Sequence, residues 1–178
     1  TRAFRSQLTK DDLFGERKVM WGDILKLDST QLYEEIKKPE NLLKQLRVFL
    51  DDFNSSSSNR MNLVFFEDAV LHILRICRAL RQPRGNLMCI GVGGSGKQSL
   101  LKLSSFMYAM NFKQIEITKG FNKNHFKDFL KERMFESGIN GDRVTFCLTD
   151  SQILEETFLE FINNLLNTGE VVNMYEQE

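Results

Sequence analysis

Apolar residues recur at helical spacing in two stretches of the first half of the chain. The stripe after Pro39 consists of Leu42, Leu46, Phe49, Leu50 and Phe53, and the next consists of Phe66, Ala69, Val70, Ile73, Leu74, Cys77 and Leu80. Three- and four-residue spacing places each set on one helical face, so both stretches predict amphipathic helices. Pro83 and Gly85 end the second helix. The polar run Asn54 to Asn59 between the stripes predicts a mobile surface loop.

Short apolar runs alternate with helical stripes in the second half. The expected strands are Leu87 to Ile90, Phe112 to Thr118 and Val144 to Leu148, and the helices that follow them carry stripes over Leu100 to Met110, Phe126 to Phe135 and Ile153 to Leu166. This β-α-β-α-β-α order predicts an α/β fold in which helices cover both faces of a parallel sheet. Residues 1–59 are expected to form a lead-in with one helix, and residues 60–178 a partial nucleotide-binding domain.

Length and charge narrow the function classes. A chain of 178 residues forms one well-buried core rather than several domains. Equal numbers of acidic and basic residues leave no net charge, which argues against binding to nucleic acid. No apolar run approaches the roughly 20 residues that cross a membrane. Cys77, Cys89 and Cys147 lie among apolar neighbours, so we expect buried free thiols in a reducing compartment, with neither a disulfide nor zinc.

A glycine-rich stretch carries the strongest functional signal. It follows an expected strand, opens an expected helix, and reads Gly91, Val92, Gly93, Gly94, Ser95, Gly96, Lys97, Gln98, Ser99. Glycines let successive backbone N–H groups turn inward, the helix start adds partial positive charge, and Lys97 can reach the outer phosphates of a nucleotide. This context predicts a phosphate-binding loop, or P-loop, rather than a flexible glycine turn.

Two positions depart from the usual pattern of such loops. Gln98 stands where Ser or Thr commonly ligates Mg²⁺, and its amide oxygen is a less preorganised ligand. Asp150 follows the third expected strand, at the sheet edge where α/β proteins place ligands, and is the natural Mg²⁺ carboxylate. It is alternatively a plain N-cap for the last helix. Ser151 follows it where hydrolytic enzymes commonly have Glu, so we expect slow or absent turnover and name no catalytic residue.

Two other function classes remain open from the residues alone. A P-loop kinase or other small-molecule phosphotransferase would also tolerate Asp150 without an adjacent Glu, but would need arginines near the transferred phosphoryl group. None follows Asp150 in the chain. A scaffold that has lost its nucleotide and only packs between neighbours is the other alternative.

The runs Leu63 to Ala69, Pro83 to Asn86 and Gly91 to Leu100 resemble the fourth AAA+ module of dynein heavy chains. The runs Thr149 to Gln152 and Phe161 to Val171 are similar to that module in axonemal heavy chains, in which both departures, at Gln98 and Ser151, also occur. The resemblance is specific from about Met61 to Glu178.

The resemblance implies a three-layer AAA+ P-loop NTPase fold, here truncated, that binds ATP or ADP with Mg²⁺. The adenine would rest near Val64 and Phe65, whose alternative role is a hydrophobic staple before the next helix. The module would regulate a ring of six modules that moves along microtubules, with neighbouring AAA+ modules of the same heavy chain as partners. The implied location is the cytoplasmic cytoskeleton, in the axoneme of a cilium or flagellum.

Overall fold

The computed structural model describes residues 19–25, 32–171 and 174–175. Its elements, in chain order, are β1 (Trp21–Gly22), β2 (Glu34–Glu35), α2 (Pro39–Ser56), α3 (Glu67–Arg81), α4 (Lys97–Met107), β3 (Asn111–Gln114), α5 (Lys123–Gly138), β4 (Val144–Cys147), the 3₁₀ turn η1 (Asp150–Gln152) and α6 (Glu156–Thr168). The helices predicted from apolar stripes are confirmed. Within the described residues, no helix combines the length and apolarity that a membrane span requires.

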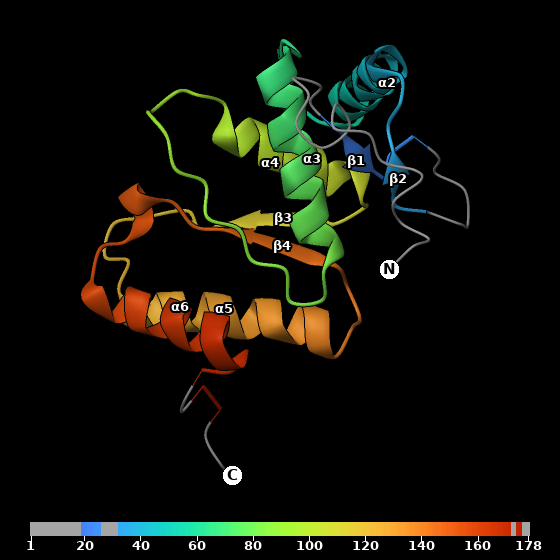
Figure 1. The fold of residues 1–178 in the computed structure, drawn as a ribbon. Coiled ribbons are helices and arrows are strands. Elements are labelled where there is room, and N and C mark those ends of the chain that lie inside the picture. The colour runs from blue at the N-terminus through green and yellow to red at the C-terminus, as the bar shows by residue number, and fades with distance from the viewer. Residues whose placement is uncertain (1–18, 26–31, 172–173, 176–178) are drawn as a thin grey trace, which may run out of the picture.

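The central feature is the parallel pair formed by β3 and β4, which are in register from Asn111 opposite Val144 to Gln114 opposite Cys147. Helices α3 and α4 lie on one side of this pair, and α5 and α6 lie on the other (Figure 1). The prediction of parallel strands joined by helices is therefore confirmed for β3 and β4. The strand expected over Phe112 to Thr118 is shorter than predicted, because the ladder ends at Gln114.

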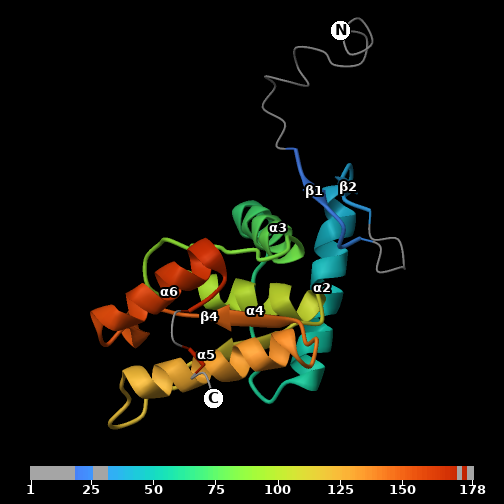
Figure 2. The same cartoon turned by 90° about the horizontal axis from the view of Figure 1, so that it is seen from below.

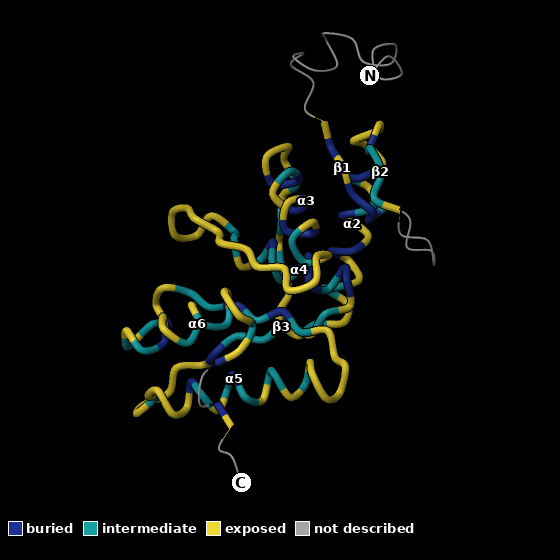
Figure 3. Tube along the Cα trace, turned by 60° about the horizontal axis from the view of Figure 1, so that its bottom comes forward, coloured by how far each residue is buried: buried dark blue, intermediate teal, exposed yellow. Residues whose placement is uncertain are grey.

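The first expected strand in chain order, Leu87 to Ile90, is absent from the described sheet, and this prediction was wrong. Met88 and Ile90 are 84% and 85% exposed, and Cys89 is exposed rather than buried. The physical reason is pairing: a strand needs a neighbour for its N–H and C=O groups, and in the described sheet β3 and β4 pair only with each other. Residues 82–95, between α3 and α4, are exposed, as Figure 3 shows.

Helix α2 runs further than predicted, into the serine run. The Ser55 and Ser56 hydroxyls donate to the backbone oxygens of Asp51 and Phe53, so these serines complete the last turn. The chain after them is tied back at its far end. The Asn54 side chain accepts from the Met61 N–H at 2.6 Å and donates to the Met61 carbonyl at 2.9 Å. The connection to α3 is thus a short closed loop.

Two hydrophobic cores flank the strand pair. The first joins α2, α3 and α4 and includes the fully buried Leu46, Ile73 and Leu103. The lead-in contributes Met20, Ile24 and Ile36 to this same core. The second core joins the strand pair to α5 and α6. In it, the rings of Phe126 and Phe158 stack with their centroids 4.3 Å apart, and both side chains are fully buried.

A buried carboxylate attaches the lead-in to the helices. The Asp23 side chain, 1% exposed, accepts a hydrogen bond from the Tyr108 hydroxyl at the end of α4. Its other oxygen lies 3.4 Å from Nε of Arg81, and the Arg81 guanidinium lies over the Tyr33 ring. The β1–β2 hairpin therefore sits against α3, beside α2 (Figure 2). Nothing in the sequence pattern indicated this role for Asp23.

Candidate functional site

The glycine-rich loop from Gly91 to Gly96 leads directly into α4. Gly94 and Gly96 have φ angles of +75° and +80°, in the left-handed region that side chains other than glycine rarely adopt. A Cβ atom added at Gly93, Gly94 or Gly96 would meet nothing within 4 Å. The open side of the loop therefore has room for a ligand to approach the backbone.

Lys97, the first residue of α4, reaches back into this loop. Its ammonium donates to the carbonyl oxygens of Gly91 and Val92, both at 2.7 Å, and to the Ser95 hydroxyl at 3.1 Å. These three contacts match the three protons of the ammonium group. The loop is thus folded around a positive charge.

The backbone amides of the loop remain available. In the described part of the chain, no hydrogen bond is donated by the amides from Gly93 to Ser99, and Leu100 is the first to donate, to the Gly96 carbonyl. Unpaired N–H groups at a helix start, together with a lysine, are the donor set that binds phosphate groups. The residues present therefore fit the phosphates of a nucleotide.

Asp150 lies on an exposed turn directly after β4. It opens η1, and Thr149 precedes it as the N-cap. The reading of Asp150 as the N-cap of the last helix was wrong, because α6 begins at Glu156 after Glu155. The next residue is Ser151, which has no carboxylate, and its hydroxyl lies 3.1 Å from the Thr149 hydroxyl. In Figure 1, η1 and the glycine loop lie on the same side of the molecule, toward which the parallel strands point.

Gln152 orients this turn and was missed in the sequence. Its side-chain oxygen accepts from the Thr149 N–H at 2.8 Å, and its buried amide nitrogen donates to the Ile115 carbonyl just after β3. It therefore ties together the ends of the two strands beside Asp150. The Thr-x-x-Gln spacing of a capping box could have identified it. Nearby, burial raises the pKa of the Cys147 thiol, which favours its neutral form.

Gln98 and Ser99, near the start of α4, line a cavity of about 570 Å³. Its walls come from the end of α2, the loop after it, α4 and the start of β3, and include Phe53, Lys102 and Phe112. Asp150 does not line this cavity. The two predicted metal ligands are therefore not united there.

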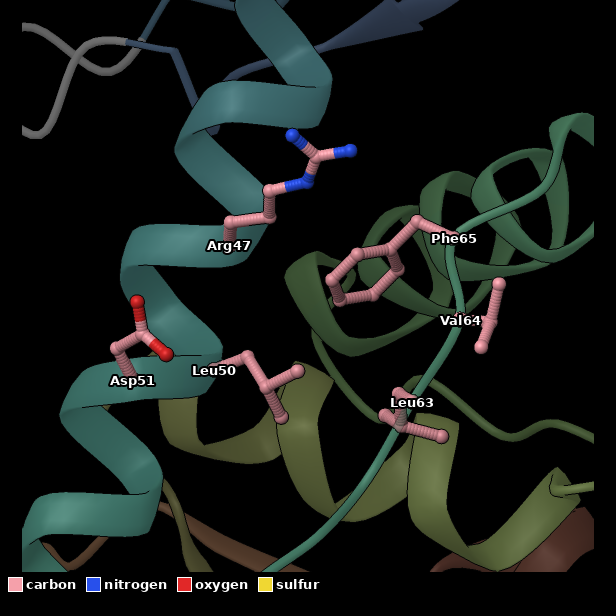
Figure 4. Close-up of a pocket in the computed structure, with 6 residues that line it drawn as sticks. All are labelled: Arg47, Leu50, Asp51, Leu63, Val64 and Phe65. Carbon is pink, nitrogen blue, oxygen red and sulfur yellow. The ribbon is translucent and has the colours of Figure 1, made fainter.

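Val64 and Phe65 line a separate cavity of about 310 Å³ between α2 and the chain before α3. In Figure 4, the Phe65 ring points toward α2, whereas Val64 points away from it and is 78% exposed. Leu50 and Leu63 add apolar lining to the cavity, and Arg47 and Asp51 add charged side chains. No residue of the glycine loop lines it. Phe65 also packs against the first core, as expected of a residue that staples the start of a helix.

A glycine loop that opens a helix, a lysine ammonium inside it and a carboxylate after a parallel strand are features of P-loop proteins. Residues 61–178 match the family described as "P-loop containing dynein motor region D4". The chain belongs to this family.

The curated relatives agree with that assignment. The chain is 43% identical over 170 residues to dynein axonemal heavy chain 3 of Mus musculus, and this match covers 95% of this chain and 4% of the relative. It is 37% identical over 170 residues to dynein axonemal heavy chain 6 of Homo sapiens, with coverages of 94% and 4%. It is 42% identical over 149 residues to dynein axonemal heavy chain 5 of Rattus norvegicus, with coverages of 83% and 4%. The chain therefore spans only a small fraction of these relatives.

Proposed function

We propose that this chain is the phosphate-binding part of a regulatory module in an axonemal dynein heavy chain, which binds ATP or ADP with Mg²⁺ and hydrolyses ATP slowly or not at all. The observation that carries the proposal is the loop in which the Lys97 ammonium bonds to Gly91 and Val92, while the amides from Gly93 to Ser99 donate to no partner among the described residues. The similarity to axonemal heavy chains supports the dynein assignment.

In this proposal, the free amides and Lys97 hold the phosphates, and Val64 and Phe65 offer apolar contact to the base. Asp150 and Gln98 would hold Mg²⁺, which screens the charge of the phosphate oxygens when it is bound. Ser151 is hydrogen-bonded to Thr149 and supplies no base to orient water, which supports weak turnover. We also propose that the module, when complete, has the three-layer AAA+ P-loop fold.

The remaining roles follow from the relatives' identity and are proposed with it. The parent protein would move along microtubules in the axoneme of a cilium or flagellum. This module would contact neighbouring AAA+ modules of the same heavy chain and regulate them through its bound nucleotide.

Calorimetric titration with ADP, with and without Mg²⁺, tests the binding proposal. We expect heat from the native chain, and a loss of at least tenfold in affinity for Lys97→Ala, because this change removes a charge-assisted contact of roughly 1.5–3 kcal/mol. Lys102→Ala is the matched control, since Lys102 lies on the same helix but packs over Phe112 instead of bonding to the loop. Absence of heat from the native chain would favour the scaffold alternative and end the proposal.

Measurement of phosphate release from ATP tests the second part of the proposal, which is slow or absent hydrolysis. We expect little release by the native chain, and an increase for Ser151→Glu, because a positioned base is worth about 10²- to 10⁴-fold in rate. Rapid release by the native chain would show that Ser151 does not limit hydrolysis.

A further inference from the structure

The segment that enters the glycine loop has little support from the sheet. Leu87 to Ile90 pair with no strand among the described residues, and their side chains are exposed. On the loop side, the segment is held by the contacts of Lys97 with Gly91 and Val92. On the other side, its position depends on the turn that follows α3.

That turn has one residue in an unusual conformation. Arg84 has a φ angle of +55°, which is uncommon for a residue with a side chain and is retained only where surrounding contacts offset its cost. Only glycine fits at the neighbouring position 85, because a Cβ atom there would lie 1.8 Å from the Ala79 carbonyl oxygen. The Gly85 N–H also donates to the Gln82 carbonyl at 3.0 Å.

The Arg84 side chain contacts the end of a helix that is distant in the sequence. Its guanidinium donates to the Thr168 carbonyl at 3.4 Å, at the C-terminal end of α6. The same group lies against Gly169, where an added Cβ atom would be 3.1 Å from the guanidinium carbon. A cation at a helix C-terminus is favoured by the partial negative charge of the unpaired carbonyl groups there.

We propose that Arg84 is a positioning residue that clamps the entrance of the glycine loop to the C-terminal end of α6. The inference rests on the proposed nucleotide-binding function. Helix α3 belongs to the first core and α6 to the second, and α6 follows the turn that carries Asp150. Arg84 therefore holds the two halves of the candidate site at a set separation, and Gly169 is the flat surface on which its guanidinium rests.

The chain carries a convenient probe of this clamp. Cys89 is exposed and lies between Arg84 and the loop, whereas Cys77 and Cys147 are buried. A nitroxide spin label on Cys89 of the full chain reports how freely this segment moves. We expect Arg84→Ala to sharpen the spectrum of the label and to weaken ADP binding about five- to tenfold, the factor that corresponds to one modest hydrogen bond.

Two glycine variants separate the clamp from general backbone strain. Gly169 and Gly141 both have positive φ angles, +77° and +74°, but only at Gly169 would a Cβ atom meet Arg84. We expect Gly169→Ala to reproduce the effects of Arg84→Ala on label mobility and affinity, and Gly141→Ala to reproduce neither.

The mobility of the label tests the clamp, and ADP binding by the native chain tests the proposed function, so the two can fail independently. An unchanged spectrum for Arg84→Ala, or equal effects of Gly169→Ala and Gly141→Ala, would overturn the clamp even if the native chain binds ADP. A mobile label in Arg84→Ala and Gly169→Ala alone would support the clamp. If the native chain then bound no ADP, the proposed function would fall and the clamp would stand as a purely conformational device.

Discussion

Removal of the Asp23 carboxylate is expected to loosen the attachment of the lead-in to the helices. The carboxylate is buried, and Asp23→Ala leaves the buried Tyr108 hydroxyl without its acceptor. An orphaned buried donor costs about 1–3 kcal/mol. The contact with Arg81 adds little, because that side chain is 36% exposed and screened by water. We therefore expect a loss of about 1–3 kcal/mol, or a fall in Tm of about 2–12 °C for a chain of this size.

Urea unfolding followed by tryptophan fluorescence measures this loss, because Trp21 is the only tryptophan and lies two residues before Asp23. Asp128→Ala, an exposed carboxylate on α5, is the control and should change stability by less than about 0.5 kcal/mol.

A double-mutant cycle with Tyr108→Phe then isolates the pair. We expect a coupling free energy of about 1–2 kcal/mol, since each single change removes the same hydrogen bond. Additive losses, or a stable Asp23→Ala variant, would refute the reasoning that this contact holds the lead-in in place.

Three further outcomes follow from the burial of particular side chains. Under native conditions, a thiol reagent such as Ellman's reagent should titrate Cys89 alone, and reaction of Cys77 or Cys147 before unfolding would contradict their burial. Burial raises the pKa of the Cys77 thiol from 9.0 to about 12, so between these pH values the folded state keeps the thiol proton while the unfolded state loses it. The free energy of unfolding should therefore fall by up to about 4 kcal/mol as pH rises from 9 to 12. Cys77→Ala should flatten this dependence in unfolding curves measured at alkaline pH. Phe158→Ala should cost about 3–5 kcal/mol in urea unfolding because the ring is fully buried against Phe126, and a loss below 1 kcal/mol would show that the second core is not packed as described.

Helices could be predicted because their signals are local. The stripe from Ala69 to Cys77 is buried as expected, and the glycine loop lies where its residue types require. The absence of a strand at Leu87 to Ile90 could not be predicted in the same way. An apolar run shows that a segment prefers burial, but pairing depends on whether another strand lies beside it, which periodicity does not report.

The contacts that orient the candidate site are the least visible in the sequence. Gln152 bonds to Ile115, Arg84 to Thr168 and Tyr108 to Asp23, across separations of 37, 84 and 85 residues. Each joins two elements whose relative placement is set by the whole fold. Only the Gln152 contact leaves a local trace, in its capping-box spacing with Thr149.

These long-range contacts also bear on the boundary expected at residue 59. The hydrophobic packing continues across this position, because Ile24 and Ile36 lie in the same core as Ile73 and Leu103. Removal of residues 1–59 would expose side chains that are now fully buried, and would also remove the partner of Tyr108 at the end of α4. Lys97 lies at the other end of this short helix. The lead-in is therefore part of the structure that holds the glycine loop, and a chain that begins at residue 60 should lose stability before its nucleotide affinity can be measured.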